Sequence, residues 1–473
     1  MPRLVSLLLL VFAPALLAAD KPNVLLVVSD DLTNNALGCY GGKAKTPNID
    51  KLAAKGVRFD RAYCQFPLCN PSRASFLTGL RPDTLQVYEN ATQFRKNVPD
   101  AVSLPQTFQK AGYATARVGK LYHYGVPGGI GTDGLDDPKS WETVVNPKGF
   151  DKDDEAADRI FTLNPKGMGS ARFGGTLSWL ASEGKDEQMT DGLIAAETVK
   201  LLEANKGKPF FLASGFFRPH TPYVAPKAYF ADYPADKISL PKVPDGHRAA
   251  GPAPAFGSSH KNQDDTTDDL RKQATQAYLA STAHMDAQVG HLLAALEKHK
   301  LSDNTIVVFI SDHGYHLGEH GLWQKMSLFE NSARVPMVIY DPRAKGNGKA
   351  CGRTVELVDL HATLADLCGL TAKTDGASLK PLLADPTAKW DKPAVTQVSR
   401  GTPTATGDTG PKIPPLMGYS VRTERFRYTE WGKGGEKGTQ LFDYSTDADE
   451  HTNLVADPKH ADTVKAMKAM LKR

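Results

Sequence analysis

The sequence predicts an α/β protein whose large, mostly parallel or mixed sheet is covered by helices on both faces, followed by a small C-terminal α+β domain. Short, continuously apolar runs alternate with helical patterns, which is typical of strands buried on both faces. Towards the C-terminus, apolar and polar residues alternate instead, which indicates antiparallel strands. The chain has 473 residues, enough for one large and one smaller domain. Its 41% hydrophobic and 23% charged residues are typical of a globular protein.

The elements of the larger domain follow from these runs in chain order. The apolar runs predict strands at 24–28, 115–118, 210–213, 305–310 and 335–340, the last with a proline near its start. The segments between them carry helical patterns at 48–55, 103–111, 189–204, 265–299 and 358–368. Two Gly- and Pro-rich segments, 125–149 and 239–261, are predicted to be long loops. Loops of this length usually shape a site or are mobile.

A change of composition at 384–393 predicts a domain boundary. We therefore divide the chain into residues 1–19, a large α/β domain at 20–385 and a small α+β domain at 386–473. In the small domain we expect antiparallel strands at 419–423, 427–431 and 440–443, then a helix from about Lys459. The stretch 401–415 has a disordered-looking composition.

The first nineteen residues have the pattern of a secretory signal peptide. Arg3 precedes an apolar run at 4–17, which ends in small residues at Ala18 and Ala19. The run is shorter than the roughly 20 apolar residues of a membrane span. We therefore expect a secreted or periplasmic protein, or a lysosomal one in a eukaryotic host, with no stable membrane span.

The charge and the cysteine content exclude several classes. A net charge of +4 without a basic run gives no basis for a nucleic-acid partner. The five cysteines, Cys39, Cys64, Cys69, Cys351 and Cys368, are too few for a disulfide scaffold. Their odd number leaves at least one of them unpaired.

Cys69 stands at the entrance of a predicted helix that continues to about Gly79. Pro71 falls in its first turn, where the missing amide hydrogen has no consequence. An anion near Cys69 would face the positive end of the helix dipole, with the forked guanidinium of Arg73 one turn further on. The alternative is a buried cysteine that happens to precede a helix.

Polar side chains follow the predicted strands at their carboxyl ends, the edge of an open α/β sheet where ligands bind. They are Asp30 and Asp31, Lys120 and His123, Arg218 and His220, and Asp312 and His313, with Lys325 in the adjoining loop and Cys69 with Arg73 at the helix start.

The acidic members of this set predict a metal site. Asp30, Asp31 and Asp312 together offer hard oxygen ligands suited to calcium or magnesium. Taken alone, Asp30 with Asp31 also fits helix capping or a turn, and Asp312 with His313 also fits a turn. Because imidazole prefers transition metals, a site of His313, His316 and His320 is an alternative. We favour exposed loop positions for the latter two, since Gly318 disfavours a helix between them.

These segments together resemble the type I sulfatases of the alkaline-phosphatase-like superfamily. The resemblance rests on the Cys-x-Pro-Ser-Arg pattern at 69–73 and on segments 22–31, 118–123, 218–223, 311–321, 355–360 and 417–423. It covers almost the whole chain after the signal segment, the two long loops least. The Asp312-His313 pair is similar to the Asp-His pair of the iduronate-2-sulfatase subgroup. Many other sulfatases have Asp-Asn at this position.

The resemblance implies a role for each matching residue. Cys69 would be oxidised to formylglycine by a maturation enzyme, and this residue with Asp30, Asp31, Asp312 and His313 would bind Ca²⁺, with Mg²⁺ less favoured. Arg73 would steady the hydroxyl groups of residue 69, and Lys120, His123, His220 and Lys325 would surround the sulfate. Asn70 departs from the small residue more often found there.

The implied reaction is hydrolysis of a sulfuric ester of a sugar or polysaccharide. Hydrated residue 69 would attack sulfur, His220 or Lys325 would protonate the departing alcohol, and His123 would help expel sulfate. The subgroup suggests a 2-O-sulfated uronate as substrate. A phosphatase or phosphodiesterase of the same fold, and an inactive protein that binds sulfated glycans, are the alternatives.

Overall fold

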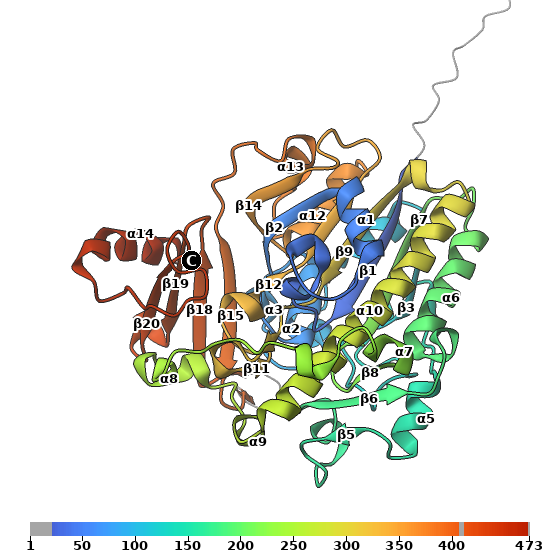
Figure 1. The fold of residues 1–473 in the computed structure, drawn as a ribbon. Coiled ribbons are helices and arrows are strands. Elements are labelled where there is room, and N and C mark those ends of the chain that lie inside the picture. Colours follow the sequence, from blue (N-terminus) through green and yellow to red (C-terminus); the bar gives the residue numbers. More distant parts are fainter. Residues whose placement is uncertain (1–20, 406–410, 472–473) are drawn as a thin grey trace, which may run out of the picture.

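The first apolar run forms strand β1 (Asn23–Asp30) in the middle of the central sheet (Figure 1). The fold is taken from a computed structural model that describes residues 21–405 and 411–471. The predicted signal segment at 1–19 lies outside the described residues.

The central sheet has the order β12-β2-β13-β9-β1-β7-β3-β4, with β14 paired to β2. Strands β9, β1, β7, β3 and β4 run parallel to one another, whereas β13 is antiparallel to both β9 and β2. The predicted mixed, mostly parallel sheet is therefore confirmed. Besides β1, its strands are β2 (Val57–Tyr63), β3 (Ala114–Gly119), β4 (Thr143–Val145), β7 (Phe210–Pro219), β9 (Thr305–Ser311), β12 (Arg334–Val335), β13 (Met337–Tyr340) and β14 (Ala350–Glu356).

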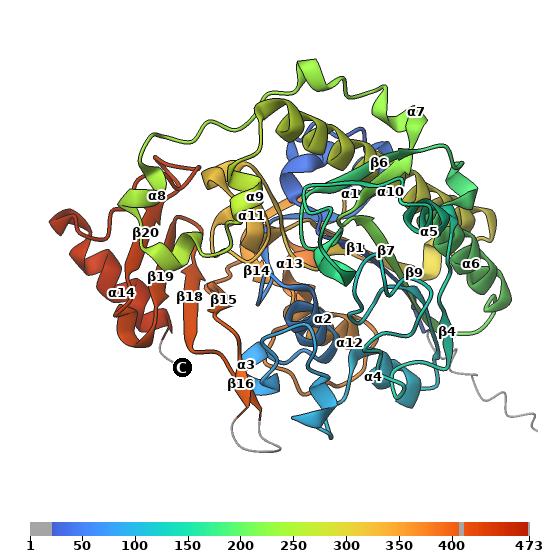
Figure 2. The same ribbon diagram turned by 90° about the horizontal axis from the view of Figure 1, so that it is seen from below.

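Helices cover both faces of this sheet, and alternate residues of β1 show the two cores. Leu25 and Val27 pack towards α1, α6 and α10, whereas Val24, Leu26 and Val28 pack towards α2, α4 and α12. Figure 2 shows these two groups of helices on opposite sides of the strands. Their bounds are α1 (Pro47–Lys55), α2 (Cys69–Thr78), α4 (Leu104–Lys110), α6 (Thr190–Ala204), α10 (Asp268–Lys298) and α12 (Asp359–Leu367).

The C-terminal part forms the predicted α+β unit. An antiparallel sheet has the order β15-β18-β19-β20, and α14 packs against β18 and β19. These elements are β15 (Ala394–Arg400), β18 (Leu416–Arg422), β19 (Phe426–Trp431), β20 (Thr439–Asp443) and α14 (Ala461–Leu471). The boundary between 385 and 386 stays a prediction.

Shorter elements complete the fold. The helices are α3 (Pro82–Leu85), α5 (Phe150–Ala156), α7 (Lys227–Phe230), α8 (His247–Ala250), α9 (Lys261–Asp264), α11 (Glu330–Ala333) and α13 (Lys380–Ala384). The strands are β5 (Phe161–Thr162), β6 (Ser178–Ser182), β8 (Tyr223–Pro226), β10 (His316–Leu317), β11 (Trp323–Gln324), β16 (Thr404–Ala405) and β17 (Lys412–Ile413). No helix within 21–405 and 411–471 combines the length and apolarity needed to cross a bilayer.

The structure corrects several details of the sequence prediction. Strands β2, β14 and β15 were not predicted, because charged or polar residues interrupt each of them. The predicted strand at 335–340 divides into β12 and β13 at Pro336, which has no amide hydrogen to donate. The stretch 401–415, expected to be disordered, pairs β16 with β17, while 406–410 lie outside the described residues.

Helix α1 is capped by a carboxylate from another helix. The Oδ1 atom of Asp286 in α10 accepts from the Ile49 amide at 2.8 Å, and its Oδ2 accepts from the Asn48 amide at 3.1 Å. We expect Asp286→Ala to lower the free energy of unfolding by about 1–3 kcal/mol, because these first-turn amides lose their acceptors. Urea unfolding measures the loss. Asp269→Ala, at an exposed position of the same helix, is the control, and an equal loss in both variants would contradict the capping role.

Candidate active site

The carboxyl ends of β1, β3, β7 and β9 meet at one edge of the central sheet, where the predicted site residues gather. Asp30 ends β1, and Lys120, His220 and Asp312 directly follow β3, β7 and β9. Helix α2 brings Cys69 to this edge as its first residue, with all ten residues of the helix buried.

The sulfur of Cys69 lies at the centre of the cluster. Its Sγ is 3.5 Å from Asp30 Oδ1, 3.4 Å from His313 Nε2 and 3.2 Å from Lys325 Nζ. The sequence prediction therefore placed in one site residues that lie far apart in the chain, such as Asp31 and Lys325, which are 294 positions apart. The structure also confirms that Cys69 stands at a helix start, with Pro71 in the first turn.

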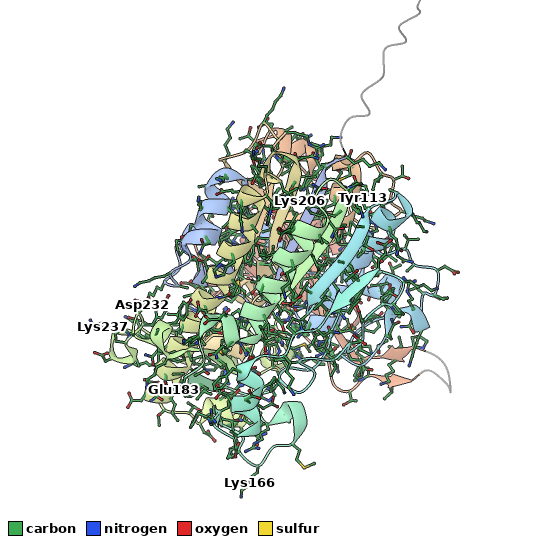
Figure 3. The ribbon with its side chains drawn as sticks, turned by 90° about the vertical axis from the view of Figure 1, so that its right-hand side faces the viewer. Tyr113, Lys166, Glu183, Lys206, Asp232 and Lys237 are labelled. Atoms are coloured by element: carbon green, nitrogen blue, oxygen red, sulfur yellow. The ribbon has the colours of Figure 1, made fainter. Side chains whose placement is uncertain are left out.

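Each buried carboxylate of the site faces a cation. Asp30 Oδ2 is 2.5 Å from Lys120 Nζ, and Asp31 Oδ1 is 2.6 Å from Lys325 Nζ. Elsewhere charged side chains such as Lys166 and Glu183 are exposed at the periphery (Figure 3). Burial of the site charges makes their pairing necessary, because a lone buried charge is strongly destabilising.

Arg73 joins the two halves of the acidic cluster. Its Nε donates to Asp312 Oδ2 at 2.9 Å, and its Nη2 lies 3.2 Å from Asp30 Oδ1. Its Nη1 donates to the backbone oxygens of Lys120 and Leu121. The guanidinium is fully buried, so in this structure it neutralises carboxylates and holds the segment after β3.

Burial and charge shift the pKa values of the site in opposite directions. Burial raises the pKa of the Asp312 carboxyl above its ordinary value, and Arg73 only partly opposes this. For Cys69, burial also acts to raise the pKa, but Lys120, Lys325 and His313 outweigh it and hold the pKa well below that of an ordinary thiol. Burial lowers the pKa of His123 to about 4, so its imidazole is neutral at pH 7.

The donor set fits a divalent cation. Two overlapping groups have one ligand atom per residue, all within 4.8 Å of one another: Asp30, Asp31, Cys69 and His220, and Asp30, Cys69, Asp312 and His313. Nδ1 of His313 donates to the Gly314 oxygen at 2.9 Å, so Nε2 is the nitrogen that faces the cluster and that would bind a metal ion after losing its proton. Carboxylate oxygens dominate the set, which favours a hard cation such as Ca²⁺ or Mg²⁺.

The transition-metal alternative with His316 and His320 does not match the structure. Neither residue belongs to a ligand group with His313 among the described residues. The prediction that both are exposed loop residues is also wrong, because the turn between β10 and β11 folds them inward. His316 Nε2 lies 2.7 Å from Ser327 Oγ, and the His320 ring stacks on Phe329 at 3.8 Å.

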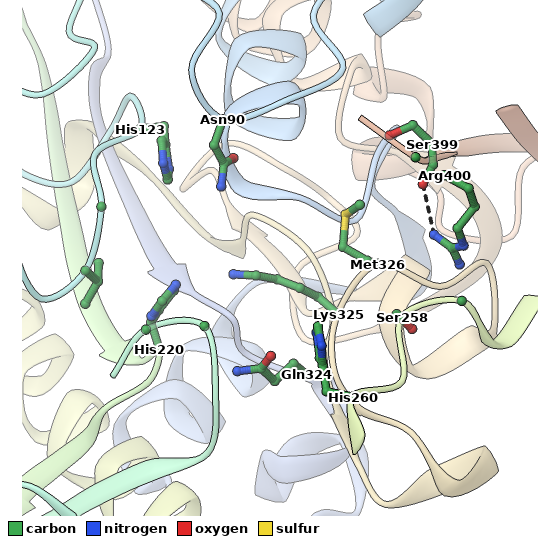
Figure 4. A pocket seen from close by; sticks show the side chains of 16 residues that line it. Asn90, His123, His220, Ser258, His260, Gln324, Lys325, Met326, Ser399 and Arg400 are labelled. Carbon is green, nitrogen blue, oxygen red and sulfur yellow. Dashed lines mark hydrogen bonds between the residues drawn. The ribbon is translucent and has the colours of Figure 1, made fainter. Parts of the chain in front are cut away.

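A cavity of about 530 Å³ opens above the cluster and is lined by His123, His220 and Lys325 (Figure 4). Both predicted long loops contribute to its wall, Gly125 and Val126 from the first and Gly257, Ser258 and His260 from the second. Sequence reasoning missed Asn90, His260, Gln324 and Arg400, which also line it. None of these four residues follows a strand that the sequence predicted or belongs to a catalytic motif. Only the composition of the segment 239–261, which contains His260, indicated part of this wall.

Asn70, which departs from the expected small residue, supports this wall. Its Nδ2 donates to the backbone oxygens of Glu89 at 2.9 Å and Thr92 at 2.7 Å. Its backbone amide donates to Asn90 Oδ1 at 3.1 Å. Asn70 therefore holds the segment that carries Asn90 into the cavity.

A mixed sheet with helices on both faces, and an acidic cluster at its strand ends, are features of an alkaline-phosphatase-like fold. Solved structures share this fold: a phosphonate monoester hydrolase of Agrobacterium radiobacter has a TM-score of 0.74 at 23% identity, covering 94% of each chain. A 2-O GAG sulfatase has a TM-score of 0.71 at 23% identity, covering 96% of this chain and 91% of its own.

The sequence comparisons define the family. The sulfatase family model matches residues 22–370, and the C-terminal model of N-sulphoglucosamine sulphohydrolase matches residues 318–473. The chain is 32% identical to iduronate 2-sulfatase of Mus musculus, covering 88% of this chain and 85% of the relative. It is 31% identical to a sulfatase of Formosa agariphila, covering 96% of this chain and 86% of the relative. The chain therefore belongs to the sulfatase family of hydrolases, as the sequence motifs predicted.

Proposed function

We propose that this protein hydrolyses sulfuric esters of sulfated sugars, with a 2-O-sulfated uronate as the favoured substrate. The observation that carries the proposal is the position of Cys69, whose Sγ lies among buried carboxylates and two lysines below an open cavity. The relatives called iduronate 2-sulfatase support the choice of sugar.

The acidic cluster would hold the metal ion. We assign Asp30, Asp31, Asp312, His313 and residue 69 as the ligands of Ca²⁺, with Mg²⁺ as the second choice. The ion would add positive charge close to the ester oxygens. Lys120 and Lys325 contact the same carboxylates and would share in stabilising the negative charge on the sulfuryl group.

Two histidines are placed to move protons. Nδ1 of His220 donates to the Thr221 oxygen at 2.5 Å, which leaves Nε2 to exchange a proton at the cavity. His123 also lines the cavity, and its buried Nδ1 has no partner among the described residues. We propose that His220 or Lys325 protonates the departing alcohol and that His123 takes a proton from residue 69.

Maturation of Cys69 to formylglycine completes the proposal. The aldehyde, in its hydrated form, would supply an oxygen nucleophile that a thiol cannot replace. The predicted signal at 1–19 supports export, so we propose that a maturation enzyme acts during or before secretion. N-terminal sequencing of the exported protein and the mass of the peptide that contains residue 69 test both points.

Removal of one cation or proton donor should slow sulfate release strongly. We expect Lys325→Ala and His220→Ala each to lower kcat by about 10²–10³-fold, as losses of single oxyanion donors do. Lys120→Ala should lower kcat by a similar factor. Released sulfate is measured under saturating substrate. Lys227→Ala removes an exposed lysine paired with Glu183 and should keep wild-type turnover. Near-wild-type turnover of all three site variants would reject the assignment.

A matched panel of esters tests the function itself. Wild-type protein is given 2-O-sulfated iduronic acid, 6-O-sulfated N-acetylglucosamine and the corresponding phosphate esters. We expect release of sulfate from the uronate to be fastest. Faster release of phosphate would support a phosphatase, and binding of the sulfated sugars without turnover, with Cys69 unmodified, would support an inactive glycan-binding protein.

A further inference from the structure

The wall of the cavity above the site holds a cation that the acidic cluster does not pair. None of the residues that line it is acidic, whereas Lys325 and Arg400 are cationic. Figure 4 shows Lys325 pointing across the cavity towards His123 and His220, with Arg400 on the opposite wall, beside Ser399. Lys325 contacts the acidic cluster and is already assigned to the ester sulfate. The proposed function therefore leaves Arg400 as a cavity cation with no assigned role.

Arg400 ends β15 and is held in place by backbone oxygens only. Its Nε donates to the Pro254 oxygen at 2.8 Å, and its Nη1 donates to the Ser399 oxygen at 3.0 Å. The guanidinium carbon lies 4.9 Å from the centre of the Trp431 ring, which fixes its plane. The loop at Gly257 approaches so closely that an added Cβ would lie 2.6 Å from Nε.

The half-buried Arg400 lacks, among the described residues, the acidic partner that fully buried arginines such as Arg73 and Arg117 have. Arg73 is paired with Asp312, and Arg117 with Asp136, both within 3 Å. No carboxylate of the described residues lies within ion-pair distance of Arg400, and its buried Nη2 has no hydrogen-bond partner among them. Burial without an anion lowers the pKa of Arg400 to about 10. A forked guanidinium of this kind matches the geometry of a carboxylate or a sulfate.

We propose that Arg400 is a specificity-determining residue that binds a second anionic group of the substrate, a carboxylate or a further sulfate on the sugar. This inference rests on the proposed function and refines it. The ester sulfate would lie at Lys325, and the second anion would approach Arg400 from the cavity. Neutral sulfated sugars would then be poorer substrates than acidic ones.

Paired substrates measure this contribution directly. The pair is 2-O-sulfated iduronic acid and its methyl ester, which differ only in the charge of the carboxyl group, and a disulfated neutral sugar tests the second source of charge. We expect Arg400→Gln to raise KM for the acid by roughly 10- to 100-fold, with kcat little changed, and to leave KM for the methyl ester unaltered. A rise in KM only for the disulfated sugar would identify the second sulfate as the group that Arg400 binds.

Two variants separate recognition from folding. Arg400→Lys keeps the charge and should retain part of the preference for the acid. Arg248→Gln removes an arginine of helix α8 that is paired with Asp264, and it should behave as the wild-type protein does. Equal KM changes for acid and methyl ester, or no change for any substrate, would overturn the role of Arg400.

The inference can also fail separately from the proposed function. Binding of the same sugars to Cys69→Ala protein, with and without Arg400→Gln, is measured by calorimetry and needs no turnover. If wild-type protein releases no sulfate but Arg400→Gln still weakens binding of the acid selectively, only the catalytic proposal fails. If sulfate is released and binding does not depend on Arg400, only the present inference fails.

Discussion

Replacement of Cys69 by alanine is expected to abolish sulfate release while the protein stays folded. The side chain is small, and its sulfur contacts polar atoms of Asp30, His313 and Lys325, so little apolar packing is lost. All proposed chemistry passes through this residue, so we expect turnover to fall by at least about 10³-fold, as for removal of a catalytic nucleophile. Sulfate release and thermal unfolding are measured on the same sample.

Cys64→Ala is the matched control for this variant. Cys64 is also buried, but burial raises the pKa of its thiol, and it packs in the core on the α2 side of the sheet. We expect this variant to keep wild-type turnover and to lose only a little stability. Substantial sulfate release by the Cys69→Ala protein would remove the central residue of the proposed mechanism.

Replacement of Arg73 by alanine is expected to have the largest effect on stability. The fully buried guanidinium contacts Asp30 and Asp312 and two backbone oxygens, and all of these partners would remain buried without it. Breaking a buried ion pair by removing one partner typically lowers the free energy of unfolding by about 3–5 kcal/mol. Urea unfolding in the presence of Ca²⁺ and of a chelator measures the change.

Arg58→Ala provides the comparison for Arg73. Arg58 also pairs with an aspartate, Asp60, but about a third of each side chain is exposed. Exposed pairs contribute about 0–1 kcal/mol, so this variant should unfold close to the wild-type protein. Similar losses in the two variants would show that the buried carboxylates do not depend on Arg73.

Much of the fold was predictable because strands that are buried on both faces consist of consecutive apolar residues. The runs at 24–28 and 305–310 became β1 and β9, and the helical pattern at 265–299 became α10. Strands β2 and β14 were missed because charged side chains interrupt their apolar pattern, such as the half-buried Arg58 and Asp60 in β2 and the buried Glu356 in β14. Whether such a segment pairs depends on its neighbours in the sheet, which lie far away in the chain.

The ten candidate site residues were predicted because of their types and their positions after strands or at a helix start. Parallel strands bring their carboxyl ends to one edge, so local sequence and sheet direction together determine that Asp30, Lys120, His220 and Asp312 meet. The burial of His316 and His320 was not predictable in this way, because it depends on how Phe329, Ser327 and a distant loop pack around them.

The sequence by itself determined the family of this protein and the candidate residues for its chemistry: the proposed nucleophile position, the proposed acidic ligands and the cations, all carried by short local patterns. Only the tertiary structure decided the walls of the cavity and the state of their charges. Arg400 is an ordinary arginine in the sequence. Only when β15, the loop at Gly257 and Trp431 pack together does it become a cation that has no acidic partner among the described residues. The physical reason is that local patterns report which face of an element is buried, whereas a cavity is formed by contacts between segments far apart in the chain.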